Sequence, residues 1–164
     1  MTLVLGIDPG LSSALALCDP EGGLLEVVDV PVIERRMVKG RVKRSIDPYE
    51  AARLIDSWAP DIGLVVIEQV GIRPGEGAVG AFSFGDGFGL LKGICYAHFF
   101  RVELVTPQVW RRSMGVKGDK DESRARASQL LPRSAGHWNL KKHDGRAEAA
   151  LIAMHGARLL KEAA

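Results

Sequence analysis

Two short apolar runs that each end in a carboxylate constrain the fold of this chain most. Residues 3–8 read LVLGID and are followed by a Pro-Gly turn, and residues 62–68 read IGLVVIE. Runs of this length and composition are typical of buried strands. The sequence therefore predicts two core strands that end in Asp8 and Glu68. The simpler reading of Asp8 is turn chemistry alone, because Asp-Pro-Gly forms good turns with no function attached.

The other elements alternate between strands and helices. Short turns join the first strand to predicted strands at 12–18 and 24–32, which favours an antiparallel meander. The sequence Asp-Pro-Tyr-Glu at 47–50 is a helix start, so strand 62–68 follows a helix and is expected to run parallel to an earlier strand. Further helices are predicted at 81–98, 107–112, 122–131 and 144–161, with a strand at 102–105.

The length and composition fit one globular domain over residues 1–164. Hydrophobic residues make up 46% of the chain and charged residues 26%. We expect no membrane span, because no apolar run approaches the ~20 residues that a bilayer requires. The only cysteines, Cys18 and Cys95, have no metal-ligand spacing. A reducing compartment such as the cytoplasm is therefore expected.

A cluster of positive charge lies between residues 35 and 44, without an acidic residue. Its members are Arg35, Arg36, Lys39, Arg41, Lys43 and Arg44. Such a cluster can neutralise nucleic-acid phosphates. It is equally compatible with a mobile, solvated loop, and we expect residues 35–45 to be such a loop.

Four carboxylates are expected to meet at one edge of the sheet. Parallel neighbouring strands would bring Asp8 and Glu68 to the same edge. Asp144 and Glu148 are four residues apart and share a face of the last helix. Hard oxygen donors of this kind suit Mg²⁺ or Mn²⁺, and two such ions about 3.5–4 Å apart support phosphodiester hydrolysis. Each acid also has a simpler explanation, as a surface residue or a partner of the helix dipole.

Four stretches carry a resemblance to a known family. GIDPG in the first strand, VVIEQV in the fourth, HDGRAEAALIA in the last helix and VTPQVWRRSMGVKGDKDESRARA before it resemble RuvC-type Holliday-junction resolvases, with most similarity to their compact phage-associated branch. The resemblance implies an α/β, RNase H-like fold, in which a five-stranded mixed sheet of three antiparallel strands followed by parallel strands is flanked by helices. It also implies a homodimer acting on a four-way DNA junction.

The resemblance also assigns roles to the acids. Asp8 would bridge two Mg²⁺ ions, for which Mn²⁺ can substitute, Glu68 and Glu148 would each hold one, and Asp144 would be the fourth ligand. The sequence departs from many family members because its last two acids are four apart and the final one is Glu. His143 is therefore an alternative to Asp144.

Basic and aromatic residues acquire expected roles in the same way. Lys120, as a catalytic group, would stabilise charge on the phosphate. The candidate DNA contacts are Lys117, Lys120, Arg111, Arg112 and the basic cluster. Some members carry an aromatic residue just after the Glu-Gln pair, close to the place where this chain has Gly71. Either Phe82 or Phe84 would substitute for it, or the function is absent. Trp110 and Trp138 are interpreted as packing residues.

The predicted function is a metal-dependent, structure-selective endodeoxyribonuclease that resolves Holliday junctions and leaves 5′-phosphate ends. A less selective nuclease for flaps, forks or RNA and a non-catalytic DNA-binding module remain alternatives. A nucleotide cofactor is not expected, because kinase-like ATPases with a similar first strand need a second domain to enclose the nucleotide.

Overall fold

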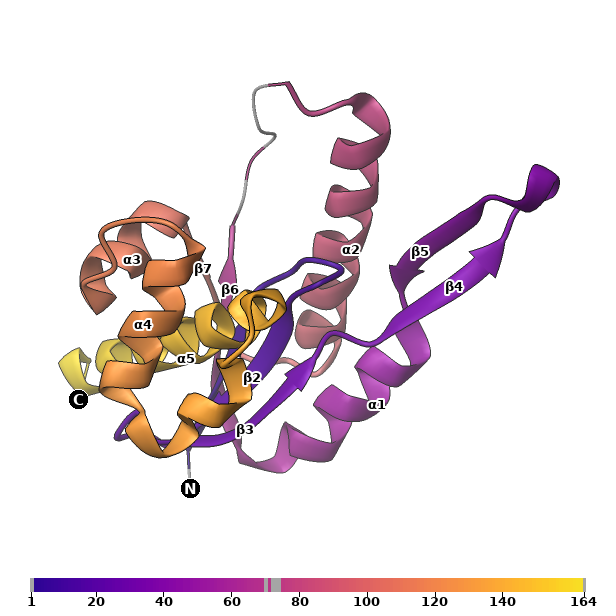
Figure 1. Cartoon of the computed structure of the whole chain (residues 1–164). Coiled ribbons are helices and arrows are strands. Elements are labelled where there is room, and N and C mark those ends of the chain that lie inside the picture. Colours follow the sequence, from indigo (N-terminus) through magenta and orange to yellow (C-terminus); the bar gives the residue numbers. More distant parts are fainter. Residues whose placement is uncertain (1, 70, 72–74, 164) are drawn as a thin grey trace.

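A five-stranded sheet forms the centre of the molecule, with strand order β3-β2-β1-β6-β7 (Figure 1). The computed structural model describes residues 2–69, 71 and 75–163. The first three strands are antiparallel, whereas β1–β6 and β6–β7 are parallel pairs. This confirms the predicted mixed sheet. The strands are β1 (Leu3–Ile7), β2 (Ala14–Cys18), β3 (Leu24–Asp29), β6 (Ile62–Glu68) and β7 (Val102–Val105).

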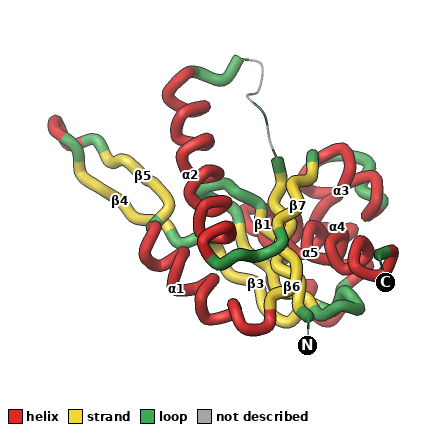
Figure 2. The backbone as a smooth tube through the Cα atoms, turned by 180° about the vertical axis from the view of Figure 1, so that it is seen from behind, coloured by secondary structure: helices red, strands yellow, loops and turns green. Residues whose placement is uncertain are grey.

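Helices cover both faces of the sheet, as Figures 1 and 2 show. Strand residues alternate between the faces, so Leu5 and Ile7 pack with α1 and α2, and Val4 packs with α5. The third and fourth helices lie on the α5 side. The helices are α1 (Pro48–Trp58), α2 (Ala78–Ala97), α3 (Pro107–Met114), α4 (Lys120–Leu130) and α5 (Asp144–Glu162). Short 3₁₀ turns are η1 (Val38–Gly40), η2 (Ala59–Asp61), η3 (Pro132–Trp138) and η4 (Lys141–His143).

Helix α5 lies unusually close to β1 because glycine stands at the crossing point. A methyl group on Gly6 would lie 2.4 Å from the backbone nitrogen of Ala153 and 2.5 Å from the carbonyl oxygen of Ala149. On the helix side, a methyl group on Gly156 would lie 2.6 Å from side-chain carbons of Val4 and Val66. These small residues therefore fix how deeply the last helix sits on the sheet.

The predicted mobile loop at 35–45 is wrong, because the chain forms a β-hairpin there. The expected strand 24–32 ends at Asp29, and β4 (Val32–Arg36) pairs antiparallel with β5 (Val42–Ile46). Gly40 permits the turn at the tip with a φ of 75°. Figures 1 and 2 show the hairpin extending away from the body of the molecule. Charged residues concealed its strand pattern, since the strands of an exposed ribbon need no regular alternation of apolar and polar side chains.

Most other predicted boundaries are close to the observed ones. The Asp47 side chain caps α1 by accepting hydrogen bonds from the amides of Tyr49 and Glu50, as its sequence indicates. The helix predicted at 81–98 starts earlier, at Ala78, and the 3₁₀ turns after α4 were not predicted. In the part of the chain that the structure describes, no helix has the length and apolarity needed to cross a membrane.

Candidate active site

Asp8 and Glu68 lie side by side because β1 and β6 are parallel neighbours. Ile7 pairs with Ile67 in the register, so the next residue of each chain is a carboxylate. Side chains alternate along a strand, and both acids fall on the face that α5 covers. Their predicted meeting at one sheet edge is therefore confirmed.

Helix α5 adds Glu148 to these two acids. Asp8, Glu68 and Glu148 are only 8, 7 and 5% exposed, and all three line one cavity of about 480 Å³. The cavity is completed by the β1–β2 loop and by residues of three later segments. Its other lining residues are Gly10, Leu11, Ser12, Ser13, Gly71, Glu76, Phe84, Pro107, Arg111 and Lys120.

The carboxylates are close enough to perturb one another. Burial, followed by the charges of Glu68 and Glu148, raises the pKa of Asp8 from 3.8 to about 8. A hydrogen bond from Ser13 and the charge of Lys120 act in the opposite direction but do not offset this rise. The site thus holds more negative charge than its own protein groups neutralise.

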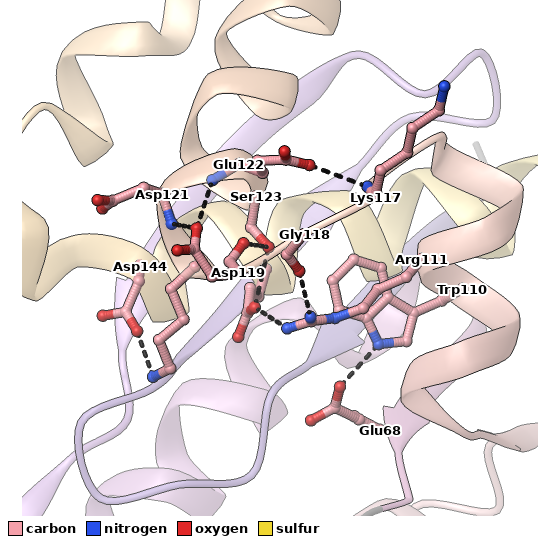
Figure 3. Close-up of polar contacts among 12 residues, drawn as sticks. Glu68, Trp110, Arg111, Lys117, Gly118, Asp119, Asp121, Glu122, Ser123 and Asp144 are labelled. Atoms are coloured by element: carbon pink, nitrogen blue, oxygen red, sulfur yellow. Dashed lines mark hydrogen bonds and ion pairs between the residues drawn. The ribbon is translucent and has the colours of Figure 1, made fainter.

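Two of the acids are held by side chains of α3 and α4 (Figure 3). The indole nitrogen of Trp110 donates a 2.7 Å hydrogen bond to Glu68. Arg111 forms a 2.7 Å ion pair with Glu148, and the Ser123 hydroxyl donates to the same carboxylate oxygen at 3.0 Å. A second Arg111 nitrogen donates to the carbonyl of Gly118, which attaches the loop before α4 to the site (Figure 3).

Asp144 occupies a different environment from the other three acids. It lies at the start of α5, is buried, and forms an ion pair with Lys120, but it does not line the cavity. Hydrogen bonding to Asp144 raises the pKa of Lys120, which keeps the ammonium group charged. Because Lys120 does line the cavity, the pair connects Asp144 to the site indirectly.

The donor chemistry fits a divalent metal, although the side chains are not closed into a ligand cluster. Three carboxylates and a shortage of positive charge are what Mg²⁺ and Mn²⁺ favour. Within residues 2–69, 71 and 75–163, however, no three His, Cys, Asp or Glu side chains are placed so that they could hold a metal ion. The protein contacts of Glu68 and Glu148 would have to adjust for a metal to bind.

The remaining predicted residues are spread more widely. Phe84 lines the cavity, whereas Phe82 is 73% exposed on α2. Lys117 is exposed, and its side chain points away from the acids in Figure 3. Arg112 is exposed on α3, and the basic cluster lies on the hairpin. His143 lines a separate pocket beside the β1–β2 loop.

The sequence did not lead us to predict that Trp110 and Ser123 bind the acids of the site directly. Trp110 is fully buried, as a packing residue would be, and its indole also bonds Glu68. Trp138 is buried too, and its indole donates to Ser128, away from the acids. The sequence feature that could have indicated this role is the position of Trp110, next to Arg111, in one of the stretches that resemble RuvC-type resolvases.

Solved structures with the same fold include two of RuvC. A structure described as T. thermophilus RuvC in complex with a Holliday junction substrate matches with a TM-score of 0.66 and 17% identity, over 98% of this chain and 96% of that chain. A structure of Thermus thermophilus RuvC matches with a TM-score of 0.57 and 18% identity, over 98% and 97% of the two chains. No family model and no curated protein matches the sequence. The chain therefore has the RNase H-like fold of RuvC along almost its whole length.

Proposed function

We propose that this protein is a metal-dependent endonuclease that resolves Holliday junctions by symmetric phosphodiester hydrolysis, leaving 5′-phosphate ends. One observation carries the proposal: Asp8, Glu68 and Glu148 come from three separate elements and line one cavity together with Arg111 and Lys120. An acidic floor with basic neighbours suits a metal ion and a phosphate at the same time. The likeness to a RuvC structure that holds a junction substrate supports four-way DNA as the substrate.

Asp8, Glu68 and Glu148 are the residues that would hold Mg²⁺, or Mn²⁺ in its place, with two ions per site. Bound there, the metal would supply Lewis-acid stabilisation of the charge that develops on the phosphodiester. Burial and the charges of Glu68 and Glu148 raise the pKa of Asp8, so its charged form would be stabilised by such a cation. Asp144 would act through Lys120, by holding the ammonium group at the rim of the cavity.

Lys120 and Arg111 would act on the phosphate itself. The Lys120 side chain is 65% exposed although its ammonium group is paired with Asp144, so a phosphate can reach it. Arg111 is held between Glu148 and the Gly118 carbonyl and presents its charge at the cavity wall. Positioned cations of this kind stabilise charge that grows in the transition state.

We also propose that a second copy of the chain binds along α2. Val79 and Phe82 on this helix are 84 and 73% exposed, and together with Met37 and Val42 of the hairpin region they line an open groove. An added methyl group at Gly89 or at two other glycines of α2, Gly85 and Gly93, would meet nothing within 4 Å. A helix backbone without side chains on one side allows another helix to approach closely.

Cleavage of a labelled four-way junction tests the function. The substrates are the junction, linear duplex, a flap and an RNA–DNA hybrid, each with Mg²⁺ and with EDTA. Paired symmetric nicks confined to the junction, and absent in EDTA, are expected. Equal cutting of all branched forms would leave a general branch nuclease, and binding without cutting in Mg²⁺ or Mn²⁺ would refute the enzyme. Sedimentation velocity without DNA tests the proposed dimer, which should have twice the mass of one chain.

The hairpin is proposed to contact DNA phosphates. Arg35 and Lys43 are directly opposite each other, an arrangement that destabilises an isolated hairpin because like charges repel. Of the cluster's cations whose side chains the structure describes, only Arg44 has an acidic partner there, Glu34 at 3.6 Å. A polyanion lying along the ribbon would relieve the repulsion.

We expect the double variant Arg35→Gln, Lys43→Gln to bind junction DNA more weakly. The slope of log K against log salt should fall by about 1.8, since each lost phosphate contact contributes about 0.9. The matched control is Arg53→Gln, Arg101→Gln, which removes two exposed charges that are already paired with Glu50 and Glu103. Equal slopes for the hairpin variant and the wild type would show that the ribbon touches no phosphate.

A further inference from the structure

A second pocket lies on the other side of the β1–β2 loop from the acidic cavity. It has a volume of about 310 Å³ and shares Leu11, Ser12 and Ser13 with the first cavity, so the two are separated by one stretch of backbone. The other walls come from the β3–β4 connection, β5, η4 and the first turn of α5. Figure 1 shows the beginning of α5 next to the β1–β2 loop.

The pocket is basic, in contrast to the acidic cavity. Arg44, Lys142 and Arg146 line it, and Asp29 is the one acid among its described lining residues. Arg146 binds both carboxylate oxygens of Asp29 at 2.6 Å, so that negative charge is already paired. The hydrogen bond from Arg146, together with the charges of Arg146, His143 and Lys142, lowers the pKa of Asp29. Lys142 is exposed and supplies charge beyond this pairing.

The first turn of α5 packs tightly against the wall between the pockets, and one polar atom beside it has no partner in the described chain. A methyl group on Gly145 would lie 2.6 Å from the Cα of Ser13 and 2.9 Å from the carbonyl oxygen of Ser12, so the first turn of α5 rests directly on the loop. The Nδ1 atom of His143 is buried and makes no hydrogen bond within the described chain. A pocket that contains three cations, of which Lys142 forms no ion pair in the part of the chain that the structure describes, together with an unsatisfied polar atom, suits an anion.

We infer that this pocket binds a backbone phosphate of the DNA substrate adjacent to the phosphate that is cleaved. Lys142 and Arg44 would contact the phosphate, and Arg146 would line its site while remaining paired with Asp29. The inference rests on the proposed function, because the cleaved phosphate would occupy the acidic cavity next door. A DNA strand that leaves the acidic cavity across the β1–β2 loop would meet this pocket first. It would then continue along the basic hairpin, whose strand β5 contributes Arg44 to the pocket.

Replacing Lys142 with Ala tests the inference, with binding measured in an Asp8→Asn background so that the junction remains uncut. We expect about tenfold weaker binding and a salt slope lower by about one, the signature of a single lost phosphate contact. The matched control is Lys141→Ala in the same background. Lys141 is the neighbouring lysine, is 87% exposed, approaches Asp121 at 3.9 Å and lines neither pocket. Thermal unfolding of each variant confirms that the fold is intact.

A neutral methylphosphonate next to the cleaved position provides the second arm. The methylphosphonate should weaken DNA binding by the protein that keeps Lys142. It should cause no further loss of binding in the Lys142→Ala variant. Equal penalties in both proteins, or equal effects of Lys141→Ala and Lys142→Ala, would overturn the inference. Stabilisation by inorganic phosphate that depends on Lys142, without any effect on DNA binding, would also overturn it in favour of a free phosphate.

The two proposals fail in different ways. A junction that is cut normally and bound without any contribution from Lys142 would refute only the second pocket. Lys142-dependent binding without cleavage by the unmodified protein would refute the nuclease and keep the pocket.

Discussion

Asp8→Asn is expected to make the metal-free protein more stable at pH 8 while removing any stabilisation by Mg²⁺. Asp8 is buried beside Glu68 and Glu148, and its pKa is raised to about 8. The unfolded chain loses this proton near pH 3.8. Between these values the folded state binds more protons than the unfolded state, so stability falls as pH rises. Below pH 3.8 the penalty is absent.

The expected change in the free energy of unfolding is large for a substitution that exchanges one heavy atom. Each pH unit in this window can remove up to ~1.4 kcal/mol of stability, and an Asn has no charge to lose. After allowing for hydrogen bonds that the amide makes less well, we expect Asp8→Asn to gain about 2–4 kcal/mol at pH 8. The melting temperature should rise by at least ~4 °C, and the difference from wild type should shrink toward pH 4.

Mg²⁺ should narrow the difference in stability between the wild type and Asp8→Asn. At a hundred times its dissociation constant, a ligand of the folded state adds about 2.7 kcal/mol, and this gain should appear in the wild type and not in Asp8→Asn. Cleavage should be lost in the variant while junction binding is kept. Asp56→Asn, the same exchange on the exposed side of α1, is the control. A melting temperature of the wild type that does not respond to Mg²⁺ or Mn²⁺ would argue against a metal site at these acids.

Gly6→Ala is expected to have the largest effect on folding. The added methyl group would lie 2.4–2.5 Å from backbone atoms of Ala153 and Ala149, and backbone within a helix cannot rotate aside as a side chain can. Overpacking a core usually costs about 1–3 kcal/mol, and this contact belongs at or beyond the upper end. A loss of ~3 kcal/mol lowers the melting temperature by about 6–12 °C in a chain of this size.

The same exchange at Gly136, an exposed residue of η3, serves as the control for Gly6→Ala. A methyl group on Gly136 would meet no atom within 4 Å, so Gly136→Ala should be neutral or stabilise the chain by about 0.4–1 kcal/mol. Chemical denaturation of the three proteins gives both differences. If Gly6→Ala were as stable as the wild type, α5 would not lie on β1 at the depth described.

The sequence was sufficient to predict the central sheet and the pairing of Asp8 with Glu68. Both acids end apolar runs, and a parallel register follows from the helix between those runs. The side-chain partners were not predictable in the same way. Trp110 lies in α3, and nothing in its local pattern specifies that its indole meets Glu68 across the fold. The pairing of Asp144 with Lys120 is likewise a long-range contact without a local signature.

The hairpin was missed for a different reason. Its strands β4 and β5 are mostly exposed, so their residues lack the alternation of apolar and polar side chains that marks a strand against a core. Only Ile46 at its root is buried, where its side chain lies against Gly87.

The close crossing of α5 over β1 determines at which stage of folding the acidic cavity forms. The elements that hold Asp8 and Glu148 come from opposite ends of the described chain, and Glu68 lies between them. Contacts between distant segments form after local ones, because closing a long loop opposes them entropically. The three acids therefore meet only when the first strand, the fourth strand of the sheet in chain order and the last helix have assembled. A partly folded chain would hold none of the proposed chemistry, so nuclease activity would arise together with the complete fold.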